Sequence, residues 1–418
     1  MSILFLPKMM FYKCLMLVLK LLVKVLPQPK PTLLSGPGSS AQLCTMISHF
    51  KVKRVLIVTD AVLEQMGLLQ SIQAALDEQG VDWRVFSGVT PDPTFSVVAA
   101  GLAEVEKHQC DALLAIGGGS AIDAAKVIAL KVTNDRSIEK LAGILKAKRP
   151  GIPLFAIPTT AGTGSEVTPA AIVSDPHTHK KSLFLDPKVI PLAAALDPEL
   201  MTGLPGHITA ATGMDALTHA IESYLSTHAT AETEFYSRAA VQMVFENLPL
   251  AYVQGDNLKA REAMSLASLY AGLAFSKANL GYVHAIAHQL GGVYQVPHGW
   301  ANAIVLPYVL DYCQDKTAKR LAELARLIGC GSAADSDEAL AQLFIDRVRQ
   351  LNEQLGIPTE IDMLQRKDIP ALAKAALKEA HYTYPVPKYM DRAQCEALIG
   401  KLMSDPVKAE AQVNANAA

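Results

Sequence analysis

Four side chains that can bind a divalent metal ion stand in two glycine-flanked segments of the sequence. Asp215 and His219 lie in G-M-D-A-L-T-H-A-I-E, and His284 and His298 lie in G-Y-V-H-A-I-A-H-Q-L-G-G-V-Y-Q-V-P-H-G. Because a helix repeats every 3.6 residues, the step from Asp215 to His219 places a carboxylate and an imidazole on one face. His288 follows His284 at the same spacing. One carboxylate and three imidazoles, without a thiolate, suit divalent Fe, Zn, Co or Ni.

The end of the second predicted helix decides whether His298 joins the other three ligands. Gly291, Gly292 and Pro297 are expected to end that helix and to turn the chain back toward the same point. The other histidines lie outside this pattern and are interpreted as packing or surface residues. They are His49, His108, His177, His179, His207, His228 and His381.

Composition narrows the class of protein. With 418 residues, of which 50% are hydrophobic, the chain is too long for one compact core, which predicts a two-domain enzyme. A net charge of -2 and an aromatic fraction of 6% argue against a nucleic-acid partner. The six cysteines are far apart and include no C-x-x-C pair, so neither a thiolate zinc site nor a disulfide framework is expected. A cytoplasmic location fits this pattern.

The chain divides into segments of different character. Residues 30–205 alternate short β-branched or apolar runs with helical patterns, which predicts an α/β domain with a parallel sheet. Residues 206–405 contain long Ala-, Leu-, Glu- and Lys-rich segments, which predict an all-helical domain that carries the metal ligands. Residues 1–29 are a basic hydrophobic extension, and residues 406–418 are expected to be a disordered tail.

Two polar loops follow neighbouring predicted strands. The strand A-L-L-A-I leads into Gly118, Gly119 and Ser120 and then a helix, where glycines and free amides favour a pyrophosphate. The motif is not G-x-G-x-x-G, and a tight turn is the alternative. The next strand leads into P-T-T-A-G-T-G-S-E, whose hydroxyls can bind phosphate or ribose oxygens; a capped turn is the alternative. Two such loops at the carboxyl edge of one parallel sheet predict a dinucleotide site.

Asp60 ends an early predicted strand. A carboxylate at that place accepts hydrogen bonds from the adenosine ribose and repels a 2'-phosphate, which favours NAD over NADP. The alternative is an aspartate that caps the next helix. Under the first interpretation, Asp60→Gly is expected to improve the relative use of NADP.

The N-terminal extension, residues 1–27, contains Lys13, Lys20 and Lys24 among apolar residues and no acid. The lysines interrupt the apolar run, and no small-residue cleavage site follows, so a secretory signal is not predicted. The run is also too short and too charged for a membrane span. A basic amphipathic segment of this kind suits a membrane surface or another subunit. The alternative is an edge strand or helix that covers the protein's own hydrophobic surface.

Taken in order, these motifs resemble the iron-containing (group III) alcohol dehydrogenases. The resemblance runs from about residue 30 through G-G-G-S-A-I-D-A-A-K, P-T-T-A-G-T-G-S-E-V-T, A-A-T-G-M-D-A-L-T-H-A-I-E and P-H-G-W-A-N-A-I-V-L-P. It implies a Rossmann-like α/β domain and an all-α domain in the dehydroquinate synthase-like architecture, and a homodimer. The implied metal ligands are Asp215, His219, His284 and His298, with His288 near the metal but not bound to it.

The resemblance also implies the cofactor residues. Gly118, Gly119 and Ser120 would contact the pyrophosphate, and Lys181 would lie close to the cofactor. The threonines that would contact the cofactor are Thr159, Thr160 and Thr163. The ligand types do not decide between iron and zinc, whereas the resemblance favours iron.

The expected activity is NAD-dependent interconversion of small primary alcohols and aldehydes. A Lewis acid beside a nicotinamide supports hydride transfer between carbon and NAD. His288 is expected either to relay the proton or to orient His284 or a water molecule. The alternatives are a lyase or cyclase of the dehydroquinate synthase type and a non-catalytic metal-binding or membrane-associated protein. Trp300 replaces an expected smaller residue near the metal, which leaves the substrate size open.

Overall fold

The computed structural model describes residues 5–25, 29–176 and 181–404. The predicted tail at 406–418 lies outside the described residues. Contacts between residues divide the chain into two compact units, one of residues 1–26, 213–249 and 277–418 and the other of residues 27–212 and 250–276. The predicted domain boundaries stay predictions. The fold class, an α/β sheet unit followed by helices, is confirmed.

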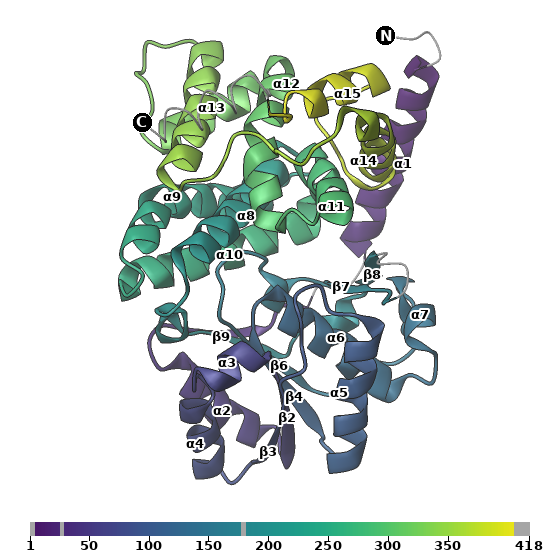
Figure 1. The fold of residues 1–418 in the computed structure, drawn as a ribbon, viewed down its shortest axis with the longest axis vertical. Coiled ribbons are helices and arrows are strands. Elements are labelled where there is room, and N and C mark those ends of the chain that lie inside the picture. Colours follow the sequence, from purple (N-terminus) through teal and green to yellow (C-terminus); the bar gives the residue numbers. More distant parts are fainter. Residues whose placement is uncertain (1–4, 26–28, 177–180, 405–418) are drawn as a thin grey trace. The chain divides into compact units, whose positions relative to one another are not determined.

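A six-stranded sheet organises the α/β unit, and every strand pair that it contains among the described residues is parallel (Figure 1). Its spatial order is β1-β9-β6-β4-β2-β3. The strands are β1 (Thr32–Ser35), β2 (Arg54–Val58), β3 (Asp82–Phe86), β4 (Ala112–Gly117), β6 (Leu154–Pro158) and β9 (Ala193–Leu196). A second sheet has the order β5-β8-β7, formed by β5 (Gly143–Ile144), β7 (Ala170–Ser174) and β8 (Lys181–Leu185).

Alternating side chains bury both faces of the large sheet. In β2, Leu56 and Val58 pack into one core with residues of α5 and α6, while Val55 and Ile57 pack into another with residues of α2 and α4. The continuous apolar runs seen in the sequence are therefore strands covered on both sides. The helical elements of this unit are α2 (Ser39–His49), α3 (Ala61–Gln65), α4 (Gln70–Glu78), α5 (Phe95–His108), α6 (Gly119–Thr133), α7 (Ile138–Leu141), η1 (Ser165–Val167), η2 (Pro187–Val189), η3 (Pro198–Met201) and most of α10 (Leu258–Ala278).

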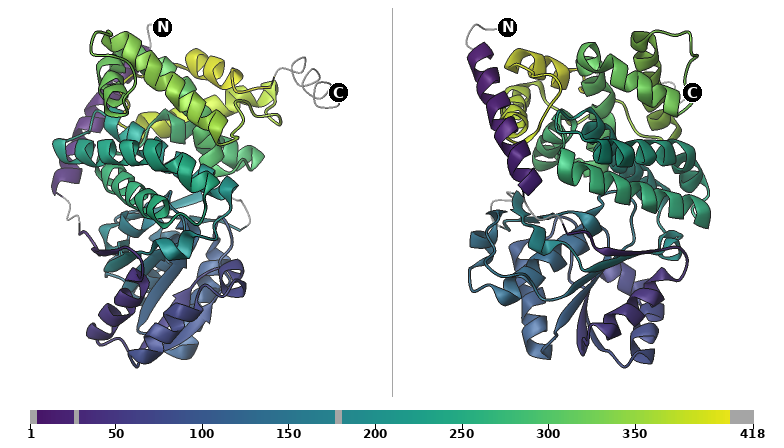
Figure 2. Two further views of the ribbon diagram at one scale, coloured as in Figure 1. Left: turned by 90° about the vertical axis from the view of Figure 1, so that its left-hand side faces the viewer. Right: turned by 180° about the vertical axis from the view of Figure 1, so that it is seen from behind.

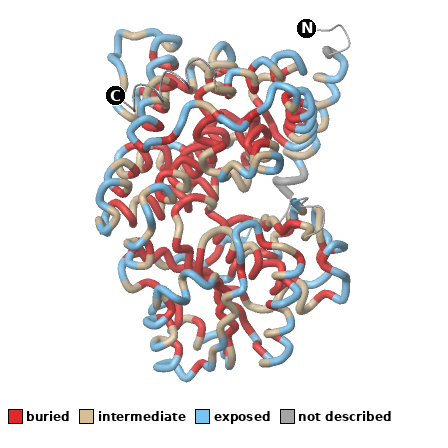
Figure 3. The backbone as a smooth tube through the Cα atoms, viewed as in Figure 1, coloured by how far each residue is buried: buried red, intermediate tan, exposed pale blue. Residues whose placement is uncertain are grey.

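The other unit is built from helices. They are α1 (Phe5–Val25), the greater part of α8 (Gly206–Leu225), most of α9 (Ala231–Val253), α11 (Tyr282–Tyr294), α12 (His298–Leu327), α13 (Asp337–Gln354), η4 (Arg366–Asp368), α14 (Ile369–Thr383) and α15 (Arg392–Gly400). Figure 3 shows that α8 and α11 are largely buried, whereas α1 is coloured mostly as exposed or intermediate. The helices that carry the predicted ligands thus lie in the core of this unit.

The N-terminal extension forms one long helix, α1, which lies along α14 (Figure 2). Among the described residues, no helix combines the length and the apolar character needed to cross a membrane.

Helix α11 ends later than the sequence indicates. Gly291 and Gly292 lie inside it, and the helix ends at Tyr294, followed by Gln295 in the left-handed region at φ 56°. The expectation that the two glycines end the helix is wrong, because neither glycine has a positive φ and helical backbone remains accessible to both. Pro297 does mark a boundary, since it directly precedes α12 and His298 is the first residue of that helix.

Candidate metal centre and dinucleotide site

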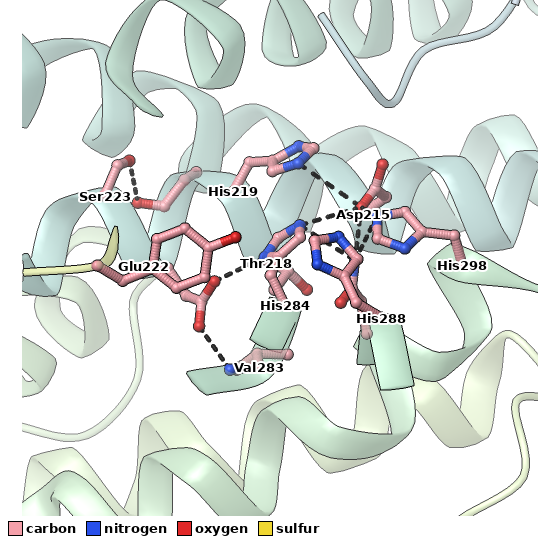
Figure 4. Close-up of polar contacts among 12 residues, drawn as sticks. Asp215, Thr218, His219, Glu222, Ser223, Val283, His284, His288 and His298 are labelled. Atoms are coloured by element: carbon pink, nitrogen blue, oxygen red, sulfur yellow. Dashed lines mark hydrogen bonds and ion pairs between the residues drawn. The ribbon is translucent and has the colours of Figure 1, made fainter. Parts of the chain in front are cut away.

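Three of the four predicted metal ligands converge on one point in the helical unit. Asp215 Oδ1 of α8 lies 3.6 Å from His284 Nε2 of α11 and 3.4 Å from His298 Nε2 of α12 (Figure 4). One ligand atom from each of these residues lies within 4.8 Å of the others, a spacing that a single metal ion can bridge. Asp215 and His284 are almost completely buried, which keeps water from competing for the same ligand atoms.

His219 lies at the edge of this group. Its Nε2 is 3.8 Å from Asp215 Oδ1, and its ring stacks on His284 with centroids 4.6 Å apart. The four-residue spacing on α8 does place Asp215 and His219 on the same face, as the sequence predicts. The compact ligand group contains the other three residues, so the role of His219 as fourth ligand stays a prediction.

Asn302, one helical turn after His298, faces the centre of the ligand group. Its Nδ2 donates to Asp215 Oδ1 at 2.7 Å and lies 3.2 Å from Nε2 of both His284 and His298. Its Oδ1 is buried and has no hydrogen-bond partner among the described residues. The carboxylate oxygen and the two ring nitrogens therefore direct their lone pairs at one small volume. This donor set fits a divalent cation.

A carboxylate fixes the orientation of His284 from behind. Glu222 Oε2 lies 2.6 Å from His284 Nδ1, and its other oxygen accepts from the backbone N–H of Val283 at 2.7 Å (Figure 4). Because a carboxylate only accepts, Nδ1 carries the proton, and in the neutral ring Nε2 is left free to bind a metal.

His288 has a carboxylate partner of its own. Glu379 of α14 lies 2.6 Å from His288 Nδ1 and also accepts from Tyr384 and Gln289. The His288 ring stacks on that of His298 with centroids 5.3 Å apart, and its side chain is 21% exposed. His288 thus lies beside the ligand group, with Nε2 on the side of the ring opposite Glu379.

The electrostatics of the group favour a bound cation. Burial alone would raise the pKa of Asp215, but the imidazoles of His219, His298 and His284 beside it hold it well below its usual range. Burial would lower the pKa of His284, yet the carboxylates of Asp215 and Glu222 on either side of its ring raise it to about 9. The two carboxylates that favour the imidazolium ion equally favour a metal ion beside the same ring.

The two predicted phosphate-binding loops lie next to each other in the α/β unit, because β4 pairs directly with β6. A side chain at Gly119, the first residue of α6, would meet Thr163 Cγ2 at 2.8 Å, and one at Gly118 would meet Thr160 Oγ1 at 3.2 Å. Gly117, which precedes them, has φ 151°. The glycines are thus required for the close approach of the loops, and Gly118, Gly119 and Ser120 at the start of α6 are only half-buried.

A buried lysine ties the second loop to the helix after the first. Lys126 of α6 donates to Ser165 Oγ at 3.0 Å, to both oxygens of Thr168 and to the carbonyl of Ala170, and Ser165 donates to Asp123 at 2.6 Å. Burial lowers the pKa of Lys126 to about 8. This cluster was not predicted from the sequence, although Asp123 and Lys126 stand three residues apart in the motif G-G-G-S-A-I-D-A-A-K.

Asp60 and Lys181 lie in different settings. Asp60 Oδ1 accepts from the amides of Val62 and Leu63 and caps α3, the alternative role considered for it. Its Oδ2 is directed toward Gly117, 3.9 Å from where a side chain there would begin. Lys181, at the start of β8, forms an ion pair of 3.0 Å with Asp92. The cofactor roles of both residues stay predictions.

Comparison with known proteins identifies the family. The model for iron-containing alcohol dehydrogenase matches residues 30–198, and the model for the C-terminal part of the Fe-containing alcohol dehydrogenase family matches residues 209–403. The chain belongs to the iron-containing alcohol dehydrogenase family. It is an oxidoreductase that interconverts alcohols and aldehydes with NAD and a divalent metal ion.

Known alcohol dehydrogenases match this chain over most of its length. It is 41% identical to alcohol dehydrogenase 4 of Schizosaccharomyces pombe, over 83% of this chain and 82% of that protein. It is 38% identical to the NAD-dependent methanol dehydrogenase of Bacillus methanolicus, over 84% and 92%. A crystal structure of 1,3-propanediol oxidoreductase superimposes with a TM-score of 0.87 at 36% identity, covering 90% of this chain and 99% of the other.

Proposed function

We propose that this alcohol dehydrogenase acts on small primary alcohols and diols and their aldehydes, with Asp215, His219, His284 and His298 as the ligands of an Fe²⁺ ion. The observation that supports this most directly is the convergence of Asp215, His284 and His298 on one volume. The relatives named for methanol and 1,3-propanediol support a small substrate. Six free cysteines without a disulfide are consistent with the cytoplasm. The homodimer implied by the resemblance is part of the same proposal.

The chemistry divides between the bound groups and the residues of the chain. When bound, the metal ion would supply Lewis acidity toward the substrate oxygen, and the cofactor would accept the hydride as NAD⁺ or donate it as NADH. Glu222 holds the ring of His284 with Nε2 toward the ligand group. His288 holds a proton at Nδ1 against Glu379, and its partly exposed ring is placed to pass a proton between the substrate side and solvent.

The cofactor residues form the second half of the proposal. Amides at Gly118, Gly119 and Ser120 bind the pyrophosphate at the start of α6, where the helix dipole favours negative charge. The hydroxyls of the neighbouring loop, together with Asp60 and Lys181, contact the rest of the cofactor. The hydroxyl residues are Thr159, Thr160 and Thr163.

Trp300 is proposed to limit the length of the substrate. It lies in the first turn of α12, two residues after His298, and is half-buried. A side chain of this size in the turn that begins with a proposed ligand would reduce the space left for a substrate. Replacement by Ala is therefore expected to move the preference toward longer alcohols.

The decisive experiment is an NAD-coupled screen of primary alcohols and diols of increasing length, on protein whose metal content has been measured. We expect NADH formation with short alcohols and a shift to longer ones in Trp300→Ala. His284→Ala should lose metal and activity together. Activity that persists in metal-free protein would refute the ligand assignment. If protein that carries a full complement of metal forms NADH with none of the alcohols, the proposed substrate class is refuted.

A further inference from the structure

Helix α1 has one face that packs against its own unit. Tyr12 lies against His381, with ring centroids 4.8 Å apart, and stacks on Tyr389 at 6.0 Å. Met16 is 4% exposed, and Lys20 donates to the backbone carbonyl of Thr227 at 2.9 Å. The helix therefore does cover a hydrophobic surface of this protein, as one of the sequence alternatives predicts, but only with this inner face.

The outer face of α1 is apolar and uncovered in the single chain. Five large hydrophobic side chains on it are each more than half exposed: Met10 at 64%, Phe11 at 56%, Leu17 at 60%, Val18 at 54% and Leu21 at 57%. At 100° per residue they fall within a sector of about 120°. We call these five residues the apolar face of α1. An exposed cluster of this kind marks a site of interaction with another surface.

The charges around the apolar face are positive. Helix α1 contains no acidic residue, and Lys8 and Lys13 are exposed on it. Helix α14 adds Lys374 and Lys378, which are exposed on the same stripe as Tyr382.

Tyr382 connects the two helices, because its ring contacts that of Phe11 with centroids 6.4 Å apart. The only acid of α14, Glu379, is hydrogen-bonded to His288 and Tyr384. The lysines of α1 and α14 therefore surround an apolar strip without a competing acid from either helix.

We propose that the apolar face of α1 rests on an anionic lipid surface, with the helix axis in the plane of the membrane interface. Apolar side chains would enter the headgroup region while the lysines bind lipid phosphates. A second copy of this chain is the less favourable occupant, because a two-fold contact would bring two equally basic faces together, with no acid of α1 to pair with their lysines. The helix lies outside both matched family segments, so the inference does not rest on the proposed function.

The test is co-sedimentation of the whole chain with vesicles. We expect binding to vesicles of phosphatidylcholine mixed with phosphatidylglycerol, weak binding to phosphatidylcholine alone, and weaker binding as salt is raised. Each lysine near the surface contributes about a fivefold gain in affinity, so Lys8→Glu with Lys13→Glu should weaken binding at least about 25-fold. Val18→Glu, which places a charge in the apolar face, should weaken it about tenfold.

Matched variants separate this proposal from a general charge or solubility effect. Lys316→Glu with Lys319→Glu makes the same charge change on exposed positions of α12, and Val253→Glu alters a valine that is 76% exposed on α9. Both controls should bind vesicles like the unaltered chain, and all variants should keep their alcohol dehydrogenase activity. Absence of binding to the anionic vesicles would overturn the proposal. So would variants of α1 that change the oligomeric state and leave vesicle binding unchanged.

Discussion

At the level of single residues, the proposed metal centre depends on side chains outside the ligand group. Glu222 lies seven residues after Asp215 and therefore on the same face of α8, where it holds His284 in place. Glu379 makes the same contact with His288, which is not in the ligand group. Each of the two carboxylates lies 2.6 Å from the Nδ1 atom of a histidine. Only the loss of Glu222 is predicted to weaken metal binding, because only His284 belongs to the ligand group.

Replacing Glu222 by Gln should weaken metal binding without removing a ligand. The amide can no longer accept from both the ring of His284 and the backbone of Val283. Loss of such an outer partner typically lowers metal affinity by about 10–100-fold. The measurement is retention of metal against increasing concentrations of a chelator.

Glu379→Gln is the matched control for this prediction, because it removes the same charge next to a histidine outside the ligand group. It should leave metal retention within about twofold of the unaltered chain. Equal losses in both variants would mean that Glu222 acts through general charge and not through His284.

Asp60 offers a second test at this scale, because its two proposed roles use different properties. The helix cap needs a side-chain oxygen, whereas rejection of NADP needs a negative charge. Asp60→Asn keeps the cap and removes the charge. It should raise kcat/KM for NADP relative to NAD by about tenfold, which corresponds to about 1.4 kcal/mol. An unchanged ratio, with unaltered thermal stability, would leave Asp60 as a cap alone.

At the level of elements, α11 shows how a helix can run through two glycines. Gly291 and Gly292 adopt helical backbone, and the end comes only at Tyr294. Glycine in a helix interior costs about 0.5–1 kcal/mol relative to Ala, because the unfolded chain loses more freedom on folding. A side chain at Gly292 would meet nothing within 4 Å.

Gly292→Ala is therefore expected to stabilise the protein by about 0.5–1 kcal/mol. The measurement is the midpoint of urea unfolding. Gly101→Ala provides the contrast, because this glycine also lies in a helix, α5, but an added side chain would meet Ile128 Cδ1 at 2.5 Å. That variant should be destabilised by about 1–3 kcal/mol. A loss of stability in Gly292→Ala would show that α11 needs glycine there for another reason.

The elements also show what the sequence can and cannot predict. Asp215 with His219 was predictable because a four-residue step places two side chains on one helix face whatever the rest of the fold does. Asn302 follows His298 at that same step and could have been found in the same way. Glu379 could not, because its contact with His288 depends on how α14 packs against α11, and no local spacing encodes that packing.

The α/β half was predicted for a different physical reason. Runs such as A-L-L-A-I are apolar at successive positions because strands of a parallel sheet are covered on both faces. The antiparallel pairing of β7 with β8 was not predicted, since the short strands of a small three-stranded sheet carry no comparable pattern. The buried ion cluster at Lys126 was also missed, because burial of a lysine follows from tertiary packing.

At the level of the whole molecule, two buried histidines lie beneath α1 in the helical unit. His381 packs against Tyr12 and shares a hydrogen bond of 2.9 Å with Tyr282. Burial lowers the pKa of His381 to about 4. Burial and the charge of Lys20 also lower the pKa of His228. Both rings are therefore neutral in the folded protein at neutral pH.

This arrangement predicts a loss of stability on the acid side. Between the unfolded pKa of 6.5 and the folded pKa of about 4, the unfolded chain binds more protons at His381, so acidification favours unfolding. For His381 alone, the free energy of unfolding should fall by about 2 kcal/mol between about pH 7 and pH 5. In His381→Gln the side chain is neutral at every pH. The free energy of unfolding of this variant should therefore fall by about 2 kcal/mol less than that of the unaltered chain over the same interval. His207→Gln, at an exposed position on α8, is the matched control. If urea unfolding of the His381→Gln variant shows the full loss, protonation beneath α1 is not what weakens the folded state in acid.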